Sequence, residues 1–284
     1  MSTDTQPHPL FGFYGPGSAM WRVNREAVLL GSGPAALLLQ IAHPLVAEGV
    51  AAHSGFDADP LLRLRRTLRT TLALVFGDGQ TAERAVAKLN AVHTRVSGAV
   101  ADPLAREVTG ASDYHALDPE LLLWVQATLV VMSVRAYESW VTPLASAERE
   151  RLWQEARLTG RRLGIPASSS PASWPALQTW FEHQLGPDGP VVVTDTARRL
   201  ATTIVRPPLP FAPGPLVDLA VLPGLALLPD SIREGYGITW TPRRAAIARA
   251  VGVGIRAWIR VTPRAWRAMP AARAAERRVA AAGP

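Results

Sequence analysis

The sequence has no cysteine among its 284 residues. This absence excludes disulfide bonds, thiolate nucleophiles, iron–sulfur clusters and cysteine-based zinc sites. Any metal or cofactor must therefore be held by oxygen or nitrogen ligands. Lysine is almost absent too, because Lys88 is the single lysine among 30 basic residues. Chemistry that passes through a lysine Schiff base is not expected in such a chain.

Several common functional motifs are also missing. Gly31-Ser32-Gly33-Pro34 has neither the spacing nor the preceding strand of a dinucleotide-binding loop. The sequence contains no phosphate-binding P-loop, no G-x-S-x-G nucleophile turn and no His-Glu-x-x-His zinc helix. A dedicated zinc site and the usual nucleotide-binding and serine-hydrolase classes are therefore not expected.

The sequence has no leader-like N-terminus and no clear membrane span. Residues 1–10 are polar, without a basic region followed by an apolar one and without a twin-arginine pair, so we expect a cytoplasmic protein. Residues 27–47 contain no charge, but they include two glycines, two prolines, a glutamine and a histidine. This composition predicts two core helices rather than one transmembrane helix.

Strand signals are scarce, whereas helix signals recur along the chain. The β-branched run 191–193 is flanked by Pro190 and Asp195, and no alternating segment or Asn-Gly turn occurs. Helix starts are marked where a cap-forming side chain precedes proline, at Asp59-Pro60, Asp118-Pro119, Thr241-Pro242 and Thr262-Pro263. We therefore predict an all-α fold. Residues 207–231 are too rich in proline for one long helix, and we expect short turns packed on the core.

Positive charge is concentrated at the C-terminal end. Residues 1–242 carry 20 basic and 22 acidic side chains, whereas residues 243–284 carry 10 and 1. Two basic amphipathic helices separated by Thr262-Pro263 fit this segment. They are suited to packing on the protein itself through an apolar stripe, to contact with a membrane surface, or to nucleic acid.

The segment 59–77 is the clearest amphipathic helix. Five apolar residues, Leu61, Leu64, Leu68, Leu72 and Val75, share one face, while Arg63, Arg66, Thr67 and Thr70 gather on the other. Three interpretations of the polar face are open: it is solvated, it binds an anion, or it lines a cofactor pocket.

His93 lies in a helix predicted over 81–98. It shares an apolar stripe with Val86, Leu89, Val96 and Val100, so it is expected to point inward. It is either a core histidine with a hydrogen-bond partner or a ligand. In a chain without cysteine, a buried neutral imidazole is the strongest remaining ligand for iron, and haem sites in helical proteins use one such histidine.

Other candidate residues lie on neighbouring predicted helices. His43 is expected to cap the short helix opened by Pro44, and His53 shares a face of it with Val46 and Val50, so that it could face a pocket. Glu48 is expected on the opposite face. Residues 119–135 are apolar nearly all round and predict a central buried helix, in which the amide of Gln126 satisfies nearby backbone or faces a ligand.

These motifs occur in an order that resembles a known family. The ordered segments are Trp21-Arg22-Val23-Asn24-Arg25-Glu26, residues 37–47 (LLLQIAHPLVA), His53-Ser54, Arg63-Leu64-Arg65-Arg66-Thr67, His93-Thr94-Arg95-Val96-Ser97-Gly98, and Asp118-Pro119 with Trp124-Val125. Together they resemble the MpaB-type oxygenases, which include the latex-clearing rubber oxygenases and the oxygenase that trims the mycophenolic acid side chain. The similarity spans about residues 20–165 and fades after 166.

The resemblance implies a single globin-like helical bundle that holds haem b, with dioxygen as co-substrate and oxidative cleavage of a carbon–carbon double bond in a lipophilic isoprenoid or secondary metabolite. By position, His93 matches the proximal iron ligand, and Arg63, Arg66 and Thr67 match a distal cluster. Glu48 is a candidate base, and His53 and Gln126 are candidate cofactor contacts. The expected organisation is an N-terminal arm (1–20), a helical haem domain (21–240) and basic C-terminal helices (241–284).

The chain departs from the family pattern at two positions. Arg66 replaces a lysine that can bind iron, which an always protonated guanidinium cannot do, and Gln126 replaces a histidine. Two other function classes stay open beside the oxygenase. One is a haem-binding sensor or carrier without turnover, and the other is a membrane-peripheral interaction protein that uses the basic tail. Nucleic acid is not expected as a partner of the whole chain, and nothing in the sequence indicates an oligomeric state.

Overall fold

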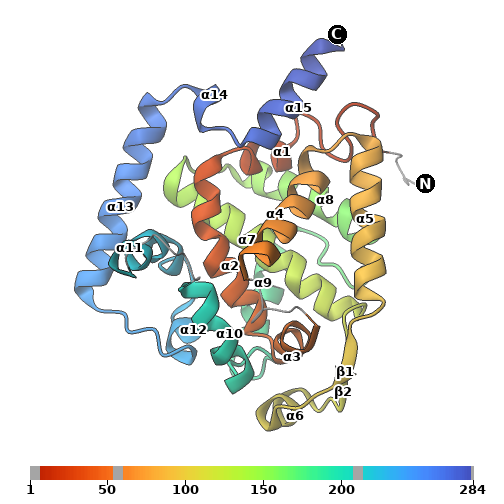
Figure 1. Cartoon of the computed structure of the whole chain (residues 1–284), viewed down its shortest axis with the longest axis vertical. Helices are drawn as coiled ribbons and strands as arrows, with labels where there is room; N and C mark the ends of the chain where they lie inside the picture. The colour runs from red at the N-terminus through yellow and green to blue at the C-terminus, as the bar shows by residue number, and fades with distance from the viewer. Residues whose placement is uncertain (1–6, 54–59, 207–213, 283–284) are drawn as a thin grey trace.

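The chain is a bundle of helices with one small two-stranded sheet (Figure 1). The computed structural model describes residues 7–53, 60–206 and 214–282, and for 60–66, 214 and 215 it describes the backbone alone. Helix accounts for 69% of the structure, which confirms the all-α prediction. The helices are α1 (Ala19–Asn24), the 3-10 helix η1 (Ala27–Ser32), α2 (Gly33–Ile41), α3 (Pro44–His53), α4 (Pro60–Phe76), α5 (Gly79–His93), α6 (Pro103–Thr109), α7 (Pro119–Trp140), α8 (Ser146–Arg162), α9 (Trp174–Gln184), α10 (Asp195–Val205), α11 (Gly214–Leu225), α12 (Asp230–Gly235), α13 (Pro242–Val261), α14 (Arg264–Arg267) and α15 (Pro270–Ala281).

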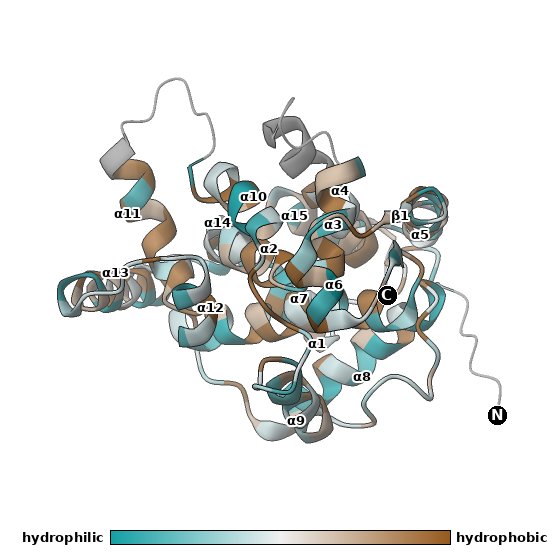
Figure 2. Ribbon diagram, turned by 90° about the horizontal axis from the view of Figure 1, so that it is seen from below, coloured by the Kyte–Doolittle hydropathy of each residue, from teal (hydrophilic) through white to brown (hydrophobic). Residues whose placement is uncertain are grey.

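The helix α7 forms the centre of the bundle. It lies in the middle of the bundle (Figure 2), packs against α1, η1, α2, α8 and α13, and has most of its side chains buried. Trp124, one of the largest buried side chains, stacks on Phe181 of α9 with ring centroids 5.4 Å apart. The segment predicted as a central helix is thus buried over most of its surface, and Leu129 is its exposed leucine.

Two segments have the length and hydropathy of a membrane span. One is α7, with 67% of its apolar window buried inside the protein. The other is η1 and α2 taken together with α3, but the chain bends by 107° between them. Both are packed in the bundle as core helices, in agreement with the interpretation of residues 27–47.

Prolines and caps fix the helix starts where the sequence places them. The Asp118 side chain accepts a hydrogen bond from the Glu120 amide at the start of α7, and Thr241 caps α13 through the Arg244 amide. The helix α4 begins at Pro60, whereas Asp59 lies outside the described residues. Thr262 ends α13, and the short helical turn α14 separates it from α15.

The predicted helix over 81–98 is wrong at its C-terminal end. The helix α5 stops at His93, and a turn leads into strand β1 (Ser97–Ala99), which pairs antiparallel with β2 (Asp113–His115). A side chain on Gly98 would collide with the Tyr114 hydroxyl, since a Cβ there would lie 2.8 Å from it. Close packing of Tyr114 over glycine thus selects the strand, so Val96 and Val100 do not continue the helical stripe.

The expectation of short turns over 207–231 is also wrong in part. Residues 214–225 form the regular helix α11, and residues 207–213 lie outside the described chain. Pro223 lies inside this helix, two residues before its end, so α11 lacks the hydrogen bond that an amide at position 223 would donate to the Leu219 carbonyl.

The basic C-terminal helices pack on the protein itself, which is one of the three interpretations of this segment. The helix α13 contacts α7 and α11, and α15 contacts α4. An ionic cluster fastens α14 and α15 to the start of the chain: Glu26 lies 3.2 Å from Arg267 of α14 and 3.5 Å from Arg25, and Arg25 lies 2.9 Å from Glu276 of α15. The Met269 amide donates to the Arg25 carbonyl at 2.8 Å.

Candidate functional site

The helices α4 and α5 form an antiparallel hairpin that brings two of the predicted motifs to one end of the bundle. They are joined by Gly77 and Asp78 and have similar lengths, so residues 60–67 lie at the same end of the hairpin as His93. Figure 1 shows the two helices diverging from the Gly77 turn towards this end, where α3 and the β1–β2 pair also lie. The resemblance predicts a site at this place.

His93 is the last residue of α5 and is half-buried. Burial lowers the pKa of its imidazole below the usual value, so the ring is neutral at neutral pH. Its Nδ1 atom is buried and has no hydrogen-bond partner within the described part of the chain. Buried polar atoms normally have a partner. A neutral ring with an unpaired buried nitrogen is the state in which histidine binds a metal.

The opposing residues of α4 are only partly described. Arg63 and Arg66 lie on the helical backbone of α4, and their side chains are outside the described residues. The Thr67 side chain is exposed, and the Thr67 carbonyl accepts a hydrogen bond from the Thr71 hydroxyl at 3.1 Å. The backbone therefore brings this motif to the same end of the hairpin as His93, and its contacts stay a prediction.

Glu48 is buried and His53 is exposed, which is the reverse of what the sequence predicts for them. Glu48 is only 6% exposed, and its Oε2 accepts a hydrogen bond from the Ala101 amide at 2.8 Å. His53 is exposed at the end of α3, with its Nε2 3.0 Å from the Ser97 carbonyl oxygen. Both side chains thus tie α3 to the segment that follows His93, and Glu48 is the one that lies inside.

Tyr114 holds the small sheet against α3. Its ring lies 3.5 Å from where a side chain on Gly49 would begin, and its centroid is 6.2 Å from that of His53. Burial and the negative charge of Glu48 raise the pKa of the Tyr114 hydroxyl. Close approach through Gly49 and Gly98 keeps Glu48, His53 and the strand after His93 in one packed unit.

Gln126 faces α8 from the central helix. Its Nε2 donates to the Ala156 carbonyl at 2.8 Å, so the amide does satisfy nearby backbone. Its Oε1 is buried and unpaired among the described residues. Asn90, three residues before His93, likewise donates to the Arg162 carbonyl at 3.0 Å and leaves a buried Oδ1 unpaired. Each of these two amides has a spare acceptor.

His43 lies at the cap position expected for it, because its carbonyl accepts a hydrogen bond from the Ala47 amide at 3.0 Å in the first turn of α3. Its ring is buried, with the centroid 6.2 Å from that of Trp124, and its Nδ1 has no partner in the described structure. Burial lowers its pKa to about 4, against a smaller opposing effect of the Asp118 carboxylate. The sequence does indicate a neutral imidazole here, because residues 27–47 around His43 contain no carboxylate that would keep the ring protonated.

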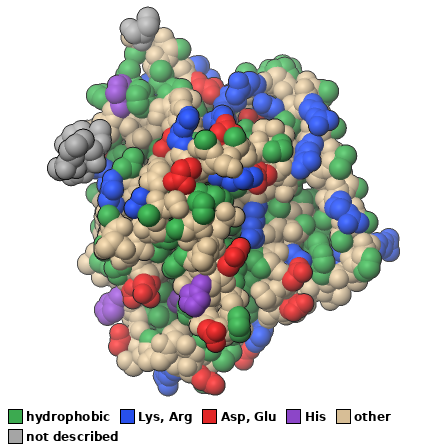
Figure 3. Space-filling view, turned by 180° about the vertical axis from the view of Figure 1, so that it is seen from behind, with side chains coloured by type: hydrophobic (Ala, Val, Ile, Leu, Met, Phe, Trp, Pro, Cys, Tyr) green, Lys and Arg blue, Asp and Glu red, His purple; other side chains and the backbone are tan. Residues whose placement is uncertain are grey.

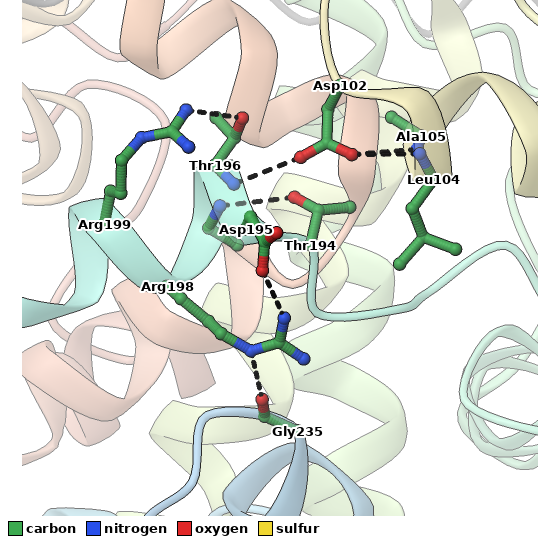
Figure 4. Close-up of polar contacts among 10 residues, drawn as sticks. Asp102, Leu104, Ala105, Thr194, Asp195, Thr196, Arg198, Arg199 and Gly235 are labelled. Carbon is green, nitrogen blue, oxygen red and sulfur yellow. Dashed lines mark hydrogen bonds and ion pairs between the residues drawn. The ribbon is translucent and has the colours of Figure 1, made fainter.

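A second polar cluster supports α3 from the other side (Figure 4). One carboxylate oxygen of Asp102 accepts from the Leu104 and Ala105 amides at the start of α6, and the other accepts from the Thr196 amide of α10 at 3.1 Å. Both α6 and α10 pack against α3. Asp102 therefore joins the starts of two helices that carry the α3 side of the site.

Comparison with known proteins identifies the family of this chain. The family described as "ER-bound oxygenase mpaB/B'/Rubber oxygenase, catalytic domain" matches residues 21–257. Two curated relatives, Uncharacterized protein Rv2237 of Mycobacterium tuberculosis and Uncharacterized protein Mb2261 of Mycobacterium bovis, are each 29% identical over 158 residues. The match covers 54% of this chain and 58% of either relative. No solved structure is significantly similar to the chain. Since the family match spans well over half of its residues, the chain belongs to the mpaB/rubber-oxygenase catalytic-domain family, a family of oxygenases and so of oxidoreductase enzymes.

Proposed function

We propose that this protein is a haem b-dependent oxygenase that acts with dioxygen on a lipophilic small molecule containing a carbon–carbon double bond. His93 carries the proposal. Its half-buried ring at the end of α5 has a lowered pKa and an unpaired buried nitrogen. The family match supports the oxygenase activity.

The residues at this end of the hairpin fit a haem. One neutral imidazole is the only protein ligand that a haem iron requires, and a chain without cysteine cannot supply a thiolate instead. Arg63 and Arg66 lie on the first turns of α4, at the same end as His93. Guanidinium groups bind carboxylates as paired donors, which suits the two propionates of a haem.

The haem would supply the redox chemistry by which dioxygen attacks the double bond. His93 would hold the iron through its neutral ring. Arg66 cannot bind iron, because its guanidinium stays protonated. Arg63, Arg66 and the Thr67 hydroxyl would act as hydrogen-bond donors to propionate or dioxygen. Glu48, buried beside the segment that follows His93, is the candidate for accepting a substrate proton.

A groove runs from the end of this motif along α4 to the Gly77 turn, which is at the opposite end of the hairpin from His93. It has a volume of about 440 Å³ and runs between α4 and α15. Its walls include Leu68, which follows Thr67 directly, together with Leu72, Phe76 and Ala274. The apolar residues around 121–132 offer less room, because they belong to the packed core of α7. Within the proposal, the groove on α4 would hold only a part of a long substrate that lies away from His93, since Phe76 and Gly77 line its far end.

The test is the absorption spectrum and iron content of the full chain expressed with a haem precursor. We expect a Soret band near ~400 nm, as a haem with an axial histidine gives. His93→Ala should shift or abolish the band and lower the iron content, whereas His115→Ala, an exposed histidine on β2, should change neither. Equal haem content in all three proteins would contradict the assignment of His93.

Oxygen consumption separates the oxygenase from a haem-binding sensor or carrier. Under reductant and air, the haem-loaded chain should consume oxygen when lipophilic alkenes are added. Haem bound through His93 with no consumption across a panel of isoprenoids would favour the sensor or carrier.

A further inference from the structure

The helix α13 turns an apolar face to solvent. Val253 is 66% exposed and Val261 is 80% exposed, and Trp266 on α14 is 78% exposed. The spacing of Val253, Ala257 and Val261 places them on one side of the helix. The opposite side, with Ala248 and Ile259 buried, packs on the bundle. Apolar residues therefore lie on two sides of α13, and the bundle covers only one of these sides.

Arginines border this uncovered face. Residues 242–281 contain ten arginines and one acidic residue, Glu276. Arg249 and Arg260 lie four residues before and seven residues after Val253, so they share its side of the helix. Both are exposed, and neither makes a hydrogen bond or ion pair within the described residues. Figure 3 shows basic and hydrophobic side chains together along the edge that α13 forms.

Arg256 of α13 and Arg267 of α14 have a structural role instead. The Arg256 guanidinium donates to the Ser139 and Glu138 carbonyls at the end of α7, at 2.6 and 2.9 Å. Arg267 donates to the Ile259 carbonyl at 2.9 Å. These bonds hold α13 in place on the bundle. The face with Val253 and Arg249 is thus presented by a helix that is already folded and anchored.

The charge decides which partner this face fits. A second copy of the chain would bring two surfaces of the same positive charge together, which opposes a symmetric dimer through this face. Nucleic acid would pair with the arginines but offers no apolar surface for Val253 and Val261. An anionic bilayer offers both, since phosphates lie at its surface and acyl chains directly below, and tryptophan is favoured at that boundary.

We propose that α13 and α14 form a docking surface for anionic lipid membranes. The helix would lie along the membrane, with Val253, Val261 and Trp266 entering the boundary between headgroups and acyl chains and with Arg249 and Arg260 on the lipid phosphates. The exposed Leu216 of α11, which packs against α13, would extend the apolar surface. The proposal does not depend on haem or on the oxygenase activity.

Flotation of the full chain with vesicles tests this surface. Vesicles of phosphatidylcholine alone are compared with vesicles that also contain phosphatidylglycerol. We expect binding to the anionic vesicles, weakened by salt, and little binding to the neutral ones. Arg249→Gln with Arg260→Gln should weaken binding roughly fivefold for each arginine removed, as expected for charges near an anionic surface.

The apolar contribution is tested with a matched pair of variants. Val253→Asp with Val261→Asp should abolish vesicle binding, and both positions are exposed, so folding should be unaffected. Leu158→Asp, which alters an exposed leucine on α8, should bind as the unchanged chain does. Equal binding to both vesicle types, equal binding of all variants, or no binding at all would overturn the proposal. The proposal would also be overturned if the unchanged chain bound no vesicles but self-associated in light scattering, and if Val253→Asp with Val261→Asp removed this self-association.

Discussion

Gly160 on α8 lies directly against the amide group of Gln126 on α7. A Cβ atom on Gly160 would lie 2.6 Å from Oε1 and 2.8 Å from Nε2 of Gln126. The amide is the end of a flexible side chain, but it is held by its hydrogen bond to the Ala156 carbonyl. The distance between α7 and α8 is therefore set by this glycine at the level of Gln126.

Gly160→Ala should destabilise the protein by about 1–3 kcal/mol, because the methyl group displaces the amide from its buried hydrogen bond. Gly254→Ala is the control: it lies on the exposed side of α13 with nothing within 4 Å, so alanine should stabilise by about 0.5–1 kcal/mol. Urea unfolding measures both. In a Gln126→Ala background the cost of Gly160→Ala should largely vanish, and an undiminished cost would show that another group fills the space.

His43 should make the fold acid-sensitive. Its folded pKa is about 4, whereas the unfolded value is 6.5, so the unfolded chain binds the proton more readily between these limits. Stability is therefore complete above about pH 6.5 and falls by about 3 kcal/mol as the pH drops towards 4. His43→Leu should flatten this part of the profile. Urea unfolding between about pH 7 and pH 5, where carboxylates contribute little, is the measurement. An unchanged slope in the variant would assign the acid sensitivity to other groups.

Asp102 should contribute more than an ordinary helix cap. Asp102→Ala removes its acceptors for α6 and for the Thr196 amide, and we expect a loss of about 2–4 kcal/mol. Thr194→Ala, which removes a single cap bond at α10, should cost about 1 kcal/mol. Thermal unfolding compares the two. Equal effects would mean that the bond between Asp102 and Thr196 adds nothing.

The pH dependence of Asp102 runs in the same direction. Burial raises its pKa, but hydrogen bonds from the Thr196 and Ala105 amides outweigh burial, so the folded pKa lies below 3.8. Its contribution is present above the unfolded pKa and is lost as the pH falls through the folded one. Asp102→Ala should therefore differ least from the unchanged chain in strong acid.

Glu48→Gln tests the proposed base. The glutamine carbonyl can still accept from the Ala101 amide, so haem content and stability should change little. If Glu48 accepts the substrate proton, turnover should drop roughly 10²–10⁴-fold. Unchanged turnover with haem bound would contradict the role as base and leave Glu48 only its structural hydrogen bond to the Ala101 amide.

Much of the fold could be predicted because local signals agree with the packing. Pro60, Pro119 and Pro242 each begin a helix, and the all-apolar 119–135 segment is the central one. The end of α5 could not be predicted, because Ser97-Gly98-Ala99 has no strand propensity and becomes a strand only through Tyr114, sixteen residues further on. Non-local packing of this kind leaves no local sequence signal.

The candidate site was predicted in position better than in orientation. The hairpin of α4 and α5 brings residues 60–67 and His93 to one end, as the order of motifs implies. Glu48 and His53 were assigned to the wrong sides of α3, because that helix is buried through Pro44, Ala47 and Glu48 rather than through Val46 and Val50. A ten-residue helix that is apolar on several sides does not reveal which side meets the core.

The ion pair between Glu26 and Arg267 constrains the order in which the chain can fold. Glu26 is a buried carboxylate near the N-terminus, and its counter-charge is near the C-terminus. During synthesis the first helices leave the ribosome well before Arg267 exists, and until then the Glu26 carboxylate has only the adjacent Arg25 as a counter-charge. The packing around Glu26 can therefore be completed only after residue 267 has been made. A chain that lacks its last twenty residues should fail at its beginning as well as at its end.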